Sequence, residues 1–393
     1  MDRSDDIILP ADTPWLTDEN AQAVCRAIEA EGARIYFVGG CVRDALLGLG
    51  GSDVDLSTDA TPEDVTRLAE QAGLKAVPTG IDHGTVTVVS GGKGFEVTTF
   101  RRDVATDGRR ATVAFSKDIR EDALRRDFTM NALYASPDGR VTDPLGGGVA
   151  DCRARRIRFI EDAATRIRED YLRILRYFRF HAWYAEADAG FDSDALDAIA
   201  SNFDGLETLS AERIGAEMLR LLAAPDPAPA IATMRQTNVL PKVLPGSDDR
   251  FLAPVVYLEA SIESVPDPIL RLAALGGEDA ADCLRLSRAD RTKLERIQTQ
   301  SFQGGSLLEV AYRHGEDVAQ GVAILRAAYS GQPVLLGDLD AIYTGAAAVL
   351  PLKAGDLMPA YEGKALGQRL ADLEARWIAS NFGMSREELM TAP

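Results

Sequence analysis

The fold of this chain is decided by Ile35-Tyr36-Phe37-Val38-Gly39-Gly40-Cys41-Val42-Arg43-Asp44 and by Asp53-Val54-Asp55 shortly after it. The apolar run Ile35–Val38 is typical of a short buried strand, and the two glycines end it. Helical spacing resumes from Cys41 to Leu47. We therefore expect a strand, a Gly-Gly turn and a helix. Glycines at such a turn let the backbone approach a phosphate, and the N–H groups of the helix N-terminus point toward its charge.

Asp53 and Asp55 are spaced so that, on a strand, both carboxylates share one face. Neighbouring carboxylates repel each other unless a cation lies between them, and Mg²⁺ binds a few carboxylates together with phosphate oxygens and water. Glu96, on a second expected strand, is a candidate third carboxylate. A solvated turn would explain the two aspartates alone. After a strand, a Gly-Gly turn and a helix, they indicate a metal-dependent nucleotidyl-transfer site.

Secondary-structure patterns divide the chain into a mixed head and a helical remainder. Thr85–Val89 and Phe95–Phe100 are rich in β-branched and aromatic residues and are separated by glycines, which predicts a hairpin. The polar run Asp103–Lys117 predicts a loop. From Asp118 onward apolar residues recur at helical spacing. We expect an α+β fold with domains at 1–150, 151–225 and 226–393.

Charge is unevenly distributed along the 393 residues. The net charge of −18 by itself argues against a nucleic-acid partner. Residues 101–180, however, contain 18 Lys+Arg against 13 Asp+Glu, whereas the other residues contain 25 against 48. This composition fits either a surface with scattered ion pairs or an arginine-rich segment that binds phosphates, so the motifs must decide.

The sequence also bears on location. No apolar run reaches the roughly 18 to 20 residues of a membrane helix, and Met1–Pro10 is polar and acidic, unlike a secretory signal. The four cysteines are far apart, which argues against a disulfide framework or a zinc site. We expect a cytoplasmic protein that does not associate with membranes, and no protein partner is evident.

Several ordered motifs resemble the tRNA nucleotidyltransferase/poly(A) polymerase family, within the polymerase-β-like nucleotidyltransferases. The resemblance is strong over about residues 33–220 and looser over Gly367–Phe382. It implies a polymerase-β-like head of small mixed sheet and helices, followed by an elongated, all-helical neck, body and tail. The residues that carry it lie in Tyr36–Gly48, Asp53–Asp55, Ile81–Thr85, Glu96–Arg101, Thr106–Arg109, Arg125–Ala132, Asp143-Pro144 and Glu169–Arg173.

The resemblance also implies roles for single residues. Gly40, Arg43 and Arg126 would hold the triphosphate, and Asp127 would accept a hydrogen bond from the ribose 2′-hydroxyl. Asp170, Arg173, Arg176 and Arg179 recur every third residue as a polar stripe on an otherwise apolar helix. The family's base-reading pair corresponds to Asp170 and Arg173, and Arg176 and Arg179 would help to hold the nucleotide.

The chemistry of the bases agrees with that pairing. Cytosine and adenine both present an exocyclic amino donor beside a ring-nitrogen acceptor, which suits a carboxylate beside an arginine. Uracil and guanine reverse both contacts, and each unpaired buried polar group costs about 1 to 3 kcal/mol. Asp170 and Arg173 could therefore select CTP and ATP without a template.

The resulting hypothesis is template-independent addition of CCA to tRNA 3′ ends. CTP and ATP are the substrates, and the tRNA acceptor arm is the partner. Two Mg²⁺ ions held by Asp53 and Asp55 would promote attack of the tRNA 3′-hydroxyl on the α-phosphate, with release of pyrophosphate. The alternatives are a poly(A) polymerase, an enzyme that adds only CC or only A, and an RNA-binding protein without catalysis. The intact Asp53, Asp55 and Arg43 argue against the last.

Overall fold

The computed structural model describes residues 7–51, 53–107, 110–186 and 190–392. The chain forms two compact units, each of which is described by itself. The first comprises the residues up to Leu221 together with Pro229–Val243, and the second comprises Leu222–Ala228 and the residues from Leu244 onward. The three-domain division at 150 and 225 stays a prediction.

The first unit is built on a mixed seven-stranded sheet of order β3-β4-β5-β2-β1-β8-β9. Only β2 and β5 pair in parallel; the other neighbours in this sheet are antiparallel. The strands are β1 (Ile35–Val38), β2 (Asp55–Thr58), β3 (Lys75–Gly80), β4 (Thr85–Ser90), β5 (Lys93–Thr99), β8 (Tyr134–Ala135) and β9 (Val141–Thr142).

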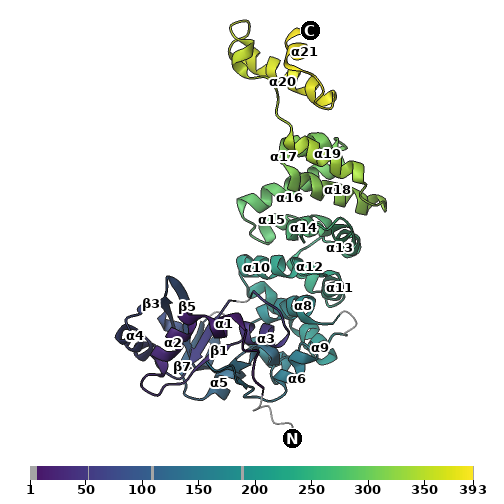
Figure 1. Ribbon diagram of the computed structural model, residues 1–393. Helices are drawn as coiled ribbons and strands as arrows, with labels where there is room; N and C mark the ends of the chain where they lie inside the picture. The colour runs from purple at the N-terminus through teal and green to yellow at the C-terminus, as the bar shows by residue number, and fades with distance from the viewer. Residues whose placement is uncertain (1–6, 52, 108–109, 187–189, 393) are drawn as a thin grey trace. The chain divides into compact units, whose positions relative to one another are not determined.

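Helices α2 (Glu19–Glu29) and α4 (Pro62–Gln71) pack on this sheet (Figure 1). Helix α4 begins as its sequence predicts: the Thr61 side chain caps it, Pro62 takes the first turn, and Glu63 and Asp64 follow. The buried side chains of α2 include Val24 and Ile28, which recur at helical spacing.

The first unit contains the further helices α1 (Pro14–Thr17), α3 (Gly40–Leu46), α5 (Ile119–Leu124), α6 (Gly148–Arg153), α7 (Ala163–Glu169), α8 (Leu172–Tyr184), α9 (Ser193–Asn202), α10 (Ala211–Leu222), α11 (Ala228–Gln236) and α12 (Val239–Val243), with short 3₁₀ turns at Ile81–His83, Thr129–Asn131 and Phe203–Thr208. Of these helices, α3, α8 and α10 contribute residues to the candidate site.

The expected loop at 103–117 was wrong. Strands β6 (Arg101–Asp107) and β7 (Arg110–Phe115) form a separate antiparallel pair, in which Arg101 lies opposite Phe115. Backbone pairing overrides the polar composition of this segment, which favoured a loop. Gly108 and Arg109, part of one family-like motif, lie outside the described residues.

The named elements of the second unit are all helices within its described residues, as expected. Arg271 is buried within it and donates to the Glu259 carboxylate at 2.7 Å and to the Leu222 carbonyl at 2.6 Å. No described helix is both long and apolar enough to cross a membrane. Its helices are α13 (Leu252–Ser261), α14 (Pro268–Leu275), α15 (Ala280–Cys283), α16 (Arg288–Gln303), α17 (Leu307–His314), α18 (Glu316–Ser330), α19 (Leu336–Ala347), α20 (Gly363–Ala379) and α21 (Arg386–Thr391), with 3₁₀ turns at Asp249–Phe251 and Ala354–Leu357.

Candidate nucleotide-binding and active site

An open cleft of about 460 Å³ lies in the first unit. Residues from the Gly-Gly turn, from β2, from the segment after α5 and from α8 and α10 line it together. Most of the side chains that the sequence singled out meet here. The lining residues are Gly39, Gly40, Arg43, Asp55, Arg125, Arg126, Asp127, Asn131, Asp170, Leu172, Arg173, Arg176, Phe180 and Arg213.

The Gly-Gly turn forms one wall of the cleft. Gly39 has φ of 72° and precedes the first residue of α3, Gly40. A Cβ atom at Gly39 would lie 3.5 Å from Nη1 of Arg126 and 3.6 Å from the carbonyl oxygen of Asn131. Glycine is favoured at this position because its backbone is left-handed, and because the turn lies against a basic side chain.

The carboxylates lie on two neighbouring parallel strands, at the start of β2 and in the middle of β5. Asp55 is the first residue of β2 and pairs in register with Glu96 on β5. Asp53 precedes β2 rather than lying within it, so the expected strand begins two residues later than the acidic pattern suggests. Loss of hydration, with the nearby charges of Glu96 and Asp53, raises the pKa of Asp55 despite the opposing effect of Arg126. Glu96 and Asp53 therefore lie close enough to Asp55 to disfavour its charge.

This arrangement fits an open metal site better than a closed one. Among the described residues, no group of three His, Cys, Asp or Glu side chains could hold a metal ion by itself. Mg²⁺ is commonly held by one or two carboxylates together with substrate phosphates and water. Asp55, with Asp53 and Glu96 near enough to raise its pKa, is therefore a candidate member of such a donor set.

Arg43 is buried, and its guanidinium group is hydrogen-bonded to neighbouring side chains. It donates to Asp44, to Oδ1 of Asn131 and to the Tyr184 hydroxyl, each at 2.7 Å. It also lies over the Tyr184 ring, 4.1 Å from the centroid. Arg43 thus lines the cleft as expected, but from a fixed, packed position.

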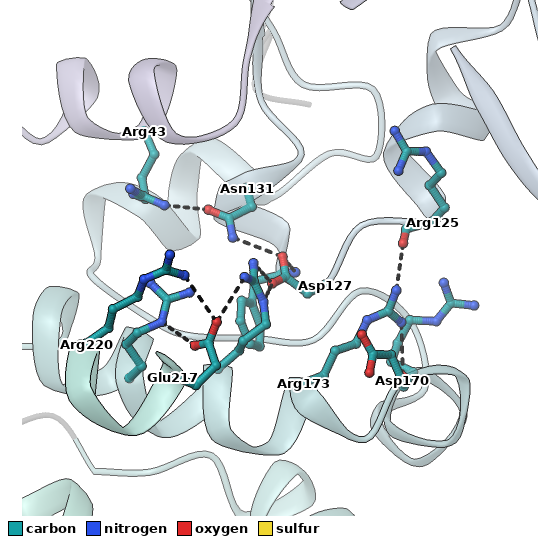
Figure 2. Close-up of polar contacts among 12 residues, drawn as sticks. Arg43, Arg125, Asp127, Asn131, Asp170, Arg173, Glu217 and Arg220 are labelled. Atoms are coloured by element: carbon teal, nitrogen blue, oxygen red, sulfur yellow. Dashed lines mark hydrogen bonds and ion pairs between the residues drawn. The ribbon is translucent and has the colours of Figure 1, made fainter. Parts of the chain in front are cut away.

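Asn131 connects Arg43 to Asp127 (Figure 2). Its Nδ2 donates to Oδ1 of Asp127 at 2.9 Å, and Nε of Arg176 donates to Oδ2 of the same carboxylate at 2.7 Å. Burial opposes the charge of Asp127, but Arg176 and Asn131 outweigh it and lower the pKa of Asp127 to about 2. Asp127 is therefore a preoriented anion at neutral pH.

Arg126 is held by a second buried acid. Its Nη2 donates to Asp122 at 3.0 Å and its Nε to the Tyr134 hydroxyl at 3.2 Å. Burial opposes the charge of Asp122, but Arg126 and Arg125 outweigh it and lower the pKa of that carboxyl. Asp122 fixes Arg126 with its Nη1 beside the Gly-Gly turn.

Asp170 and Arg173 both line the cleft, and their backbones are joined by a hydrogen bond from the Arg173 N–H to the Asp170 carbonyl, but their side chains bind different partners. Asp170 has φ of −153° and lies between α7 and α8, so it is not on the helix that the stripe predicted. Its Oδ2 accepts from Nη2 of Arg213 at 2.7 Å. Arg173 lies on α8 and donates to Glu169 at 2.7 Å and to the carbonyls of Arg166 and Arg125 at 3.0 and 2.8 Å.

The carboxylate of Glu217, on α10, lies among the remaining arginines of the site (Figure 2). Its buried carboxylate accepts from Nε of Arg179 at 2.6 Å and lies 3.8 Å from Arg176 and 3.6 Å from Arg220. Arg179 does not line the cleft, so it differs in placement from the other three residues of the stripe.

The sequence did not assign roles to three residues of this site. Asn131 lies within a quoted motif but received no role, and Arg213 and Glu217 come from a helix about forty residues beyond the stripe. For Arg213 and Glu217 the sequence offered one indication: they are four residues apart and so share one face of α10. Nothing local indicated what that face contacts.

Two family models match the chain. One is described as the poly A polymerase head domain and matches residues 35–158. The other is described as a probable RNA and SrmB-binding site of polymerase A and matches residues 190–251.

Curated proteins match over different lengths. The mitochondrial CCA tRNA nucleotidyltransferase 1 of Mus musculus is 30% identical over 400 residues, which cover 96% of this chain and 90% of the mouse protein. The CCA-adding enzyme of Geobacillus stearothermophilus is 40% identical over 230 residues, or 58% of this chain and 55% of that enzyme.

Solved structures share the fold. The Bacillus stearothermophilus CCA-adding enzyme in complex with CTP has a TM-score of 0.73 and 29% identity, and the match covers 94% of this chain and 93% of that one. The Thermotoga maritima CCA-adding enzyme complexed with tRNA has a TM-score of 0.67 and 19% identity over 98% of both chains.

Proposed function

Because this chain belongs to the CCA tRNA nucleotidyltransferase family, we propose that it adds CCA to the 3′ end of tRNA from CTP and ATP without a template. The observation that carries this proposal is the cleft itself. Its walls combine a Gly-Gly turn, the strand-end carboxylate of Asp55 and buried arginines held by acids. That combination suits a nucleoside triphosphate beside a divalent cation.

The proposed mechanism assigns each group a task. Asp53 and Asp55 would hold Mg²⁺, with Glu96 as a candidate third ligand. When bound, the metal would activate the tRNA 3′-hydroxyl for attack on the α-phosphate and neutralise the departing pyrophosphate. Gly40, Arg43 and Arg126 bind the triphosphate, because planar guanidinium groups suit phosphate oxygens. Asp127 is ionised and fixed, and accepts from the ribose 2′-hydroxyl.

Base choice is assigned to Asp170 and Arg173. Arg173 is fixed by Glu169 and two carbonyls, and it lies beside Asp170 at the cleft (Figure 2). An amino group of cytosine or adenine would donate to Asp170, while Arg173 would donate to the ring nitrogen. Arg176, anchored on Asp127, supports the nucleotide from α8. Arg179 does not line the cleft and acts through Glu217, whose carboxylate also lies 3.8 Å from Arg176.

The test uses a tRNA transcript that ends at the discriminator base, with Mg²⁺ and purified protein. CTP alone should add two residues, and CTP with ATP should add three. Long tails from ATP alone would identify a poly(A) polymerase, and addition of only CC or only A would identify a partial enzyme. RNA binding without addition would leave a non-catalytic protein.

We further propose a cytoplasmic location. All four cysteines are free thiols, and Cys25, Cys41 and Cys152 are buried, which agrees with a reducing compartment. The Mus musculus and Danio rerio relatives are described as mitochondrial, so fractionation of cells that express the full chain decides between the two. Recovery with organelles would contradict the proposal.

A further inference from the structure

Asp170 is held by a residue from a distant helix. Nη2 of Arg213, on α10, donates to Oδ2 of Asp170 across 43 residues of sequence. Both residues line the same cleft. The proposed mechanism uses Asp170 to read the base but assigns nothing to Arg213.

The two base-reading residues differ in how they are fixed. Arg173 lies within α8, its side chain is 11% exposed, and it donates to a carboxylate and two carbonyls. Asp170 lies in extended backbone between two helices, and its side chain is 32% exposed. Its Oδ1 accepts from the backbone N–H of Leu172 at 3.1 Å. Within the described part of the chain, Arg213 provides the one side-chain hydrogen bond to this carboxylate.

The ion pair between Arg213 and Asp170 serves to orient the carboxylate rather than to stabilise the folded protein. A partly exposed ion pair contributes little to the free energy of unfolding. Selection between bases, in contrast, depends on a carboxylate that is aimed before the base arrives, because small misplacements weaken directional contacts. Arg213 holds Oδ2 and the backbone N–H of Leu172 holds Oδ1, so both oxygens of Asp170 are fixed in direction. Each oxygen of an ionised carboxylate keeps a further lone pair that can accept from an amino group.

We propose that Arg213 is a positioning residue for base selection: it aims the Asp170 carboxylate at the exocyclic amino group of cytosine or adenine and thereby strengthens the rejection of UTP. This inference rests on the proposed role of Asp170 in base recognition. Arg213 does not touch the nucleotide itself.

The first experiment compares addition of CMP and of UMP to tRNA lacking CCA. Arg213→Ala should lower the preference for CTP over UTP about tenfold, mainly through a higher KM for CTP. Arg213→Lys, which keeps a donor, should recover part of the preference. Arg26→Ala is the matched control, because Arg26 pairs with Glu19 on the exposed surface of α2. Unchanged selectivity in Arg213→Ala would overturn the proposal.

A double variant separates positioning from direct contact. If Arg213 acts through Asp170, Arg213→Ala should have no further effect on selectivity in an Asp170→Ala background. A full additional loss there would show that Arg213 contacts the nucleotide, which also overturns the proposal. Dissociation constants for CTP and UTP give the same comparison for variants that do not turn over.

The same series distinguishes failure of the inference from failure of the function. If Asp170→Ala alone leaves selectivity unchanged, the base-reading role of Asp170 is wrong, and the role of Arg213 fails with it. If Asp170→Ala lowers selectivity and Arg213→Ala does not, only the inference about Arg213 fails.

Discussion

Asp55 on β2 lies directly opposite Glu96 on β5, in register between the two parallel strands of the sheet. Loss of hydration and the charge of Glu96 are the two largest causes of the raised pKa of Asp55. Two carboxylates in this position are unfavourable unless they share a cation, so the pair provides a direct test of the metal site.

The Glu96→Gln variant should show whether Glu96 binds the metal or only places a negative charge beside Asp55. If Glu96 shares the metal, the Mg²⁺ concentration for half-maximal activity should rise about tenfold or more. If it acts only through charge, its removal lowers the pKa of Asp55, and the acidic limb of the pH–activity profile moves to lower pH. A titration with Mg²⁺ at two pH values distinguishes these outcomes.

Asp55→Asn should reduce nucleotide addition at least about 100-fold, because a neutral amide cannot balance the charge of the cation. Single-turnover addition of labelled CMP measures the effect. Glu63→Gln on the exposed surface of α4 is the control and should keep normal activity. Equal activity of Asp55→Asn and the wild-type protein would remove Asp55 from the catalytic machinery.

Asp127 should make the free energy of unfolding depend on pH in the acidic range. Its pKa is about 2 in the folded protein, against about 3.9 in an unfolded chain. The lowered pKa contributes about 2 to 3 kcal/mol above pH 4, and the contribution is lost as the pH falls toward 2. Urea unfolding of Asp127→Asn and the wild-type protein should therefore differ most at pH 7 and about half as much at pH 3. A difference that does not depend on pH would contradict this.

Arg271→Met should destabilise the second unit by about 3 to 5 kcal/mol, because it leaves Glu259 as an unpaired buried charge. Arg271 also donates to the carbonyls of Leu222 and Ala224, which lose their partner. Glu259→Leu combined with Arg271→Met should recover part of the loss. Denaturant unfolding followed by tryptophan fluorescence measures both, and a greater loss in the double variant would contradict the explanation.

The head could be predicted from sequence because its signals are local. Ile35–Val38, the Gly-Gly turn and the hairpin of β4 and β5 each combine a periodic pattern with a glycine break, and all three are confirmed. Strands β6 and β7 were both missed because polar residues and a glycine in 103–117 resemble a loop, whereas the backbone pairing of the two strands decides their structure.

The site could be predicted only in part. The sequence identified most of the residues that line the cleft, since they lie in compact motifs. It placed Asp170 on the helix that carries Arg173, because spacing by three residues does not reveal that the backbone is extended there. The contacts of Arg213 and Glu217 depend on how α10 packs against α8, which no local pattern encodes.

The most direct test of the central claim is to sequence the 3′ ends of tRNA after prolonged incubation with the protein, Mg²⁺ and all four nucleoside triphosphates. The account predicts that transcripts ending at the discriminator base gain CCA and then stop, with little incorporation of U or G. Oligo(A) tails, products that end after CC or gain only A, mixed sequences, or no Mg²⁺-dependent addition would each contradict it.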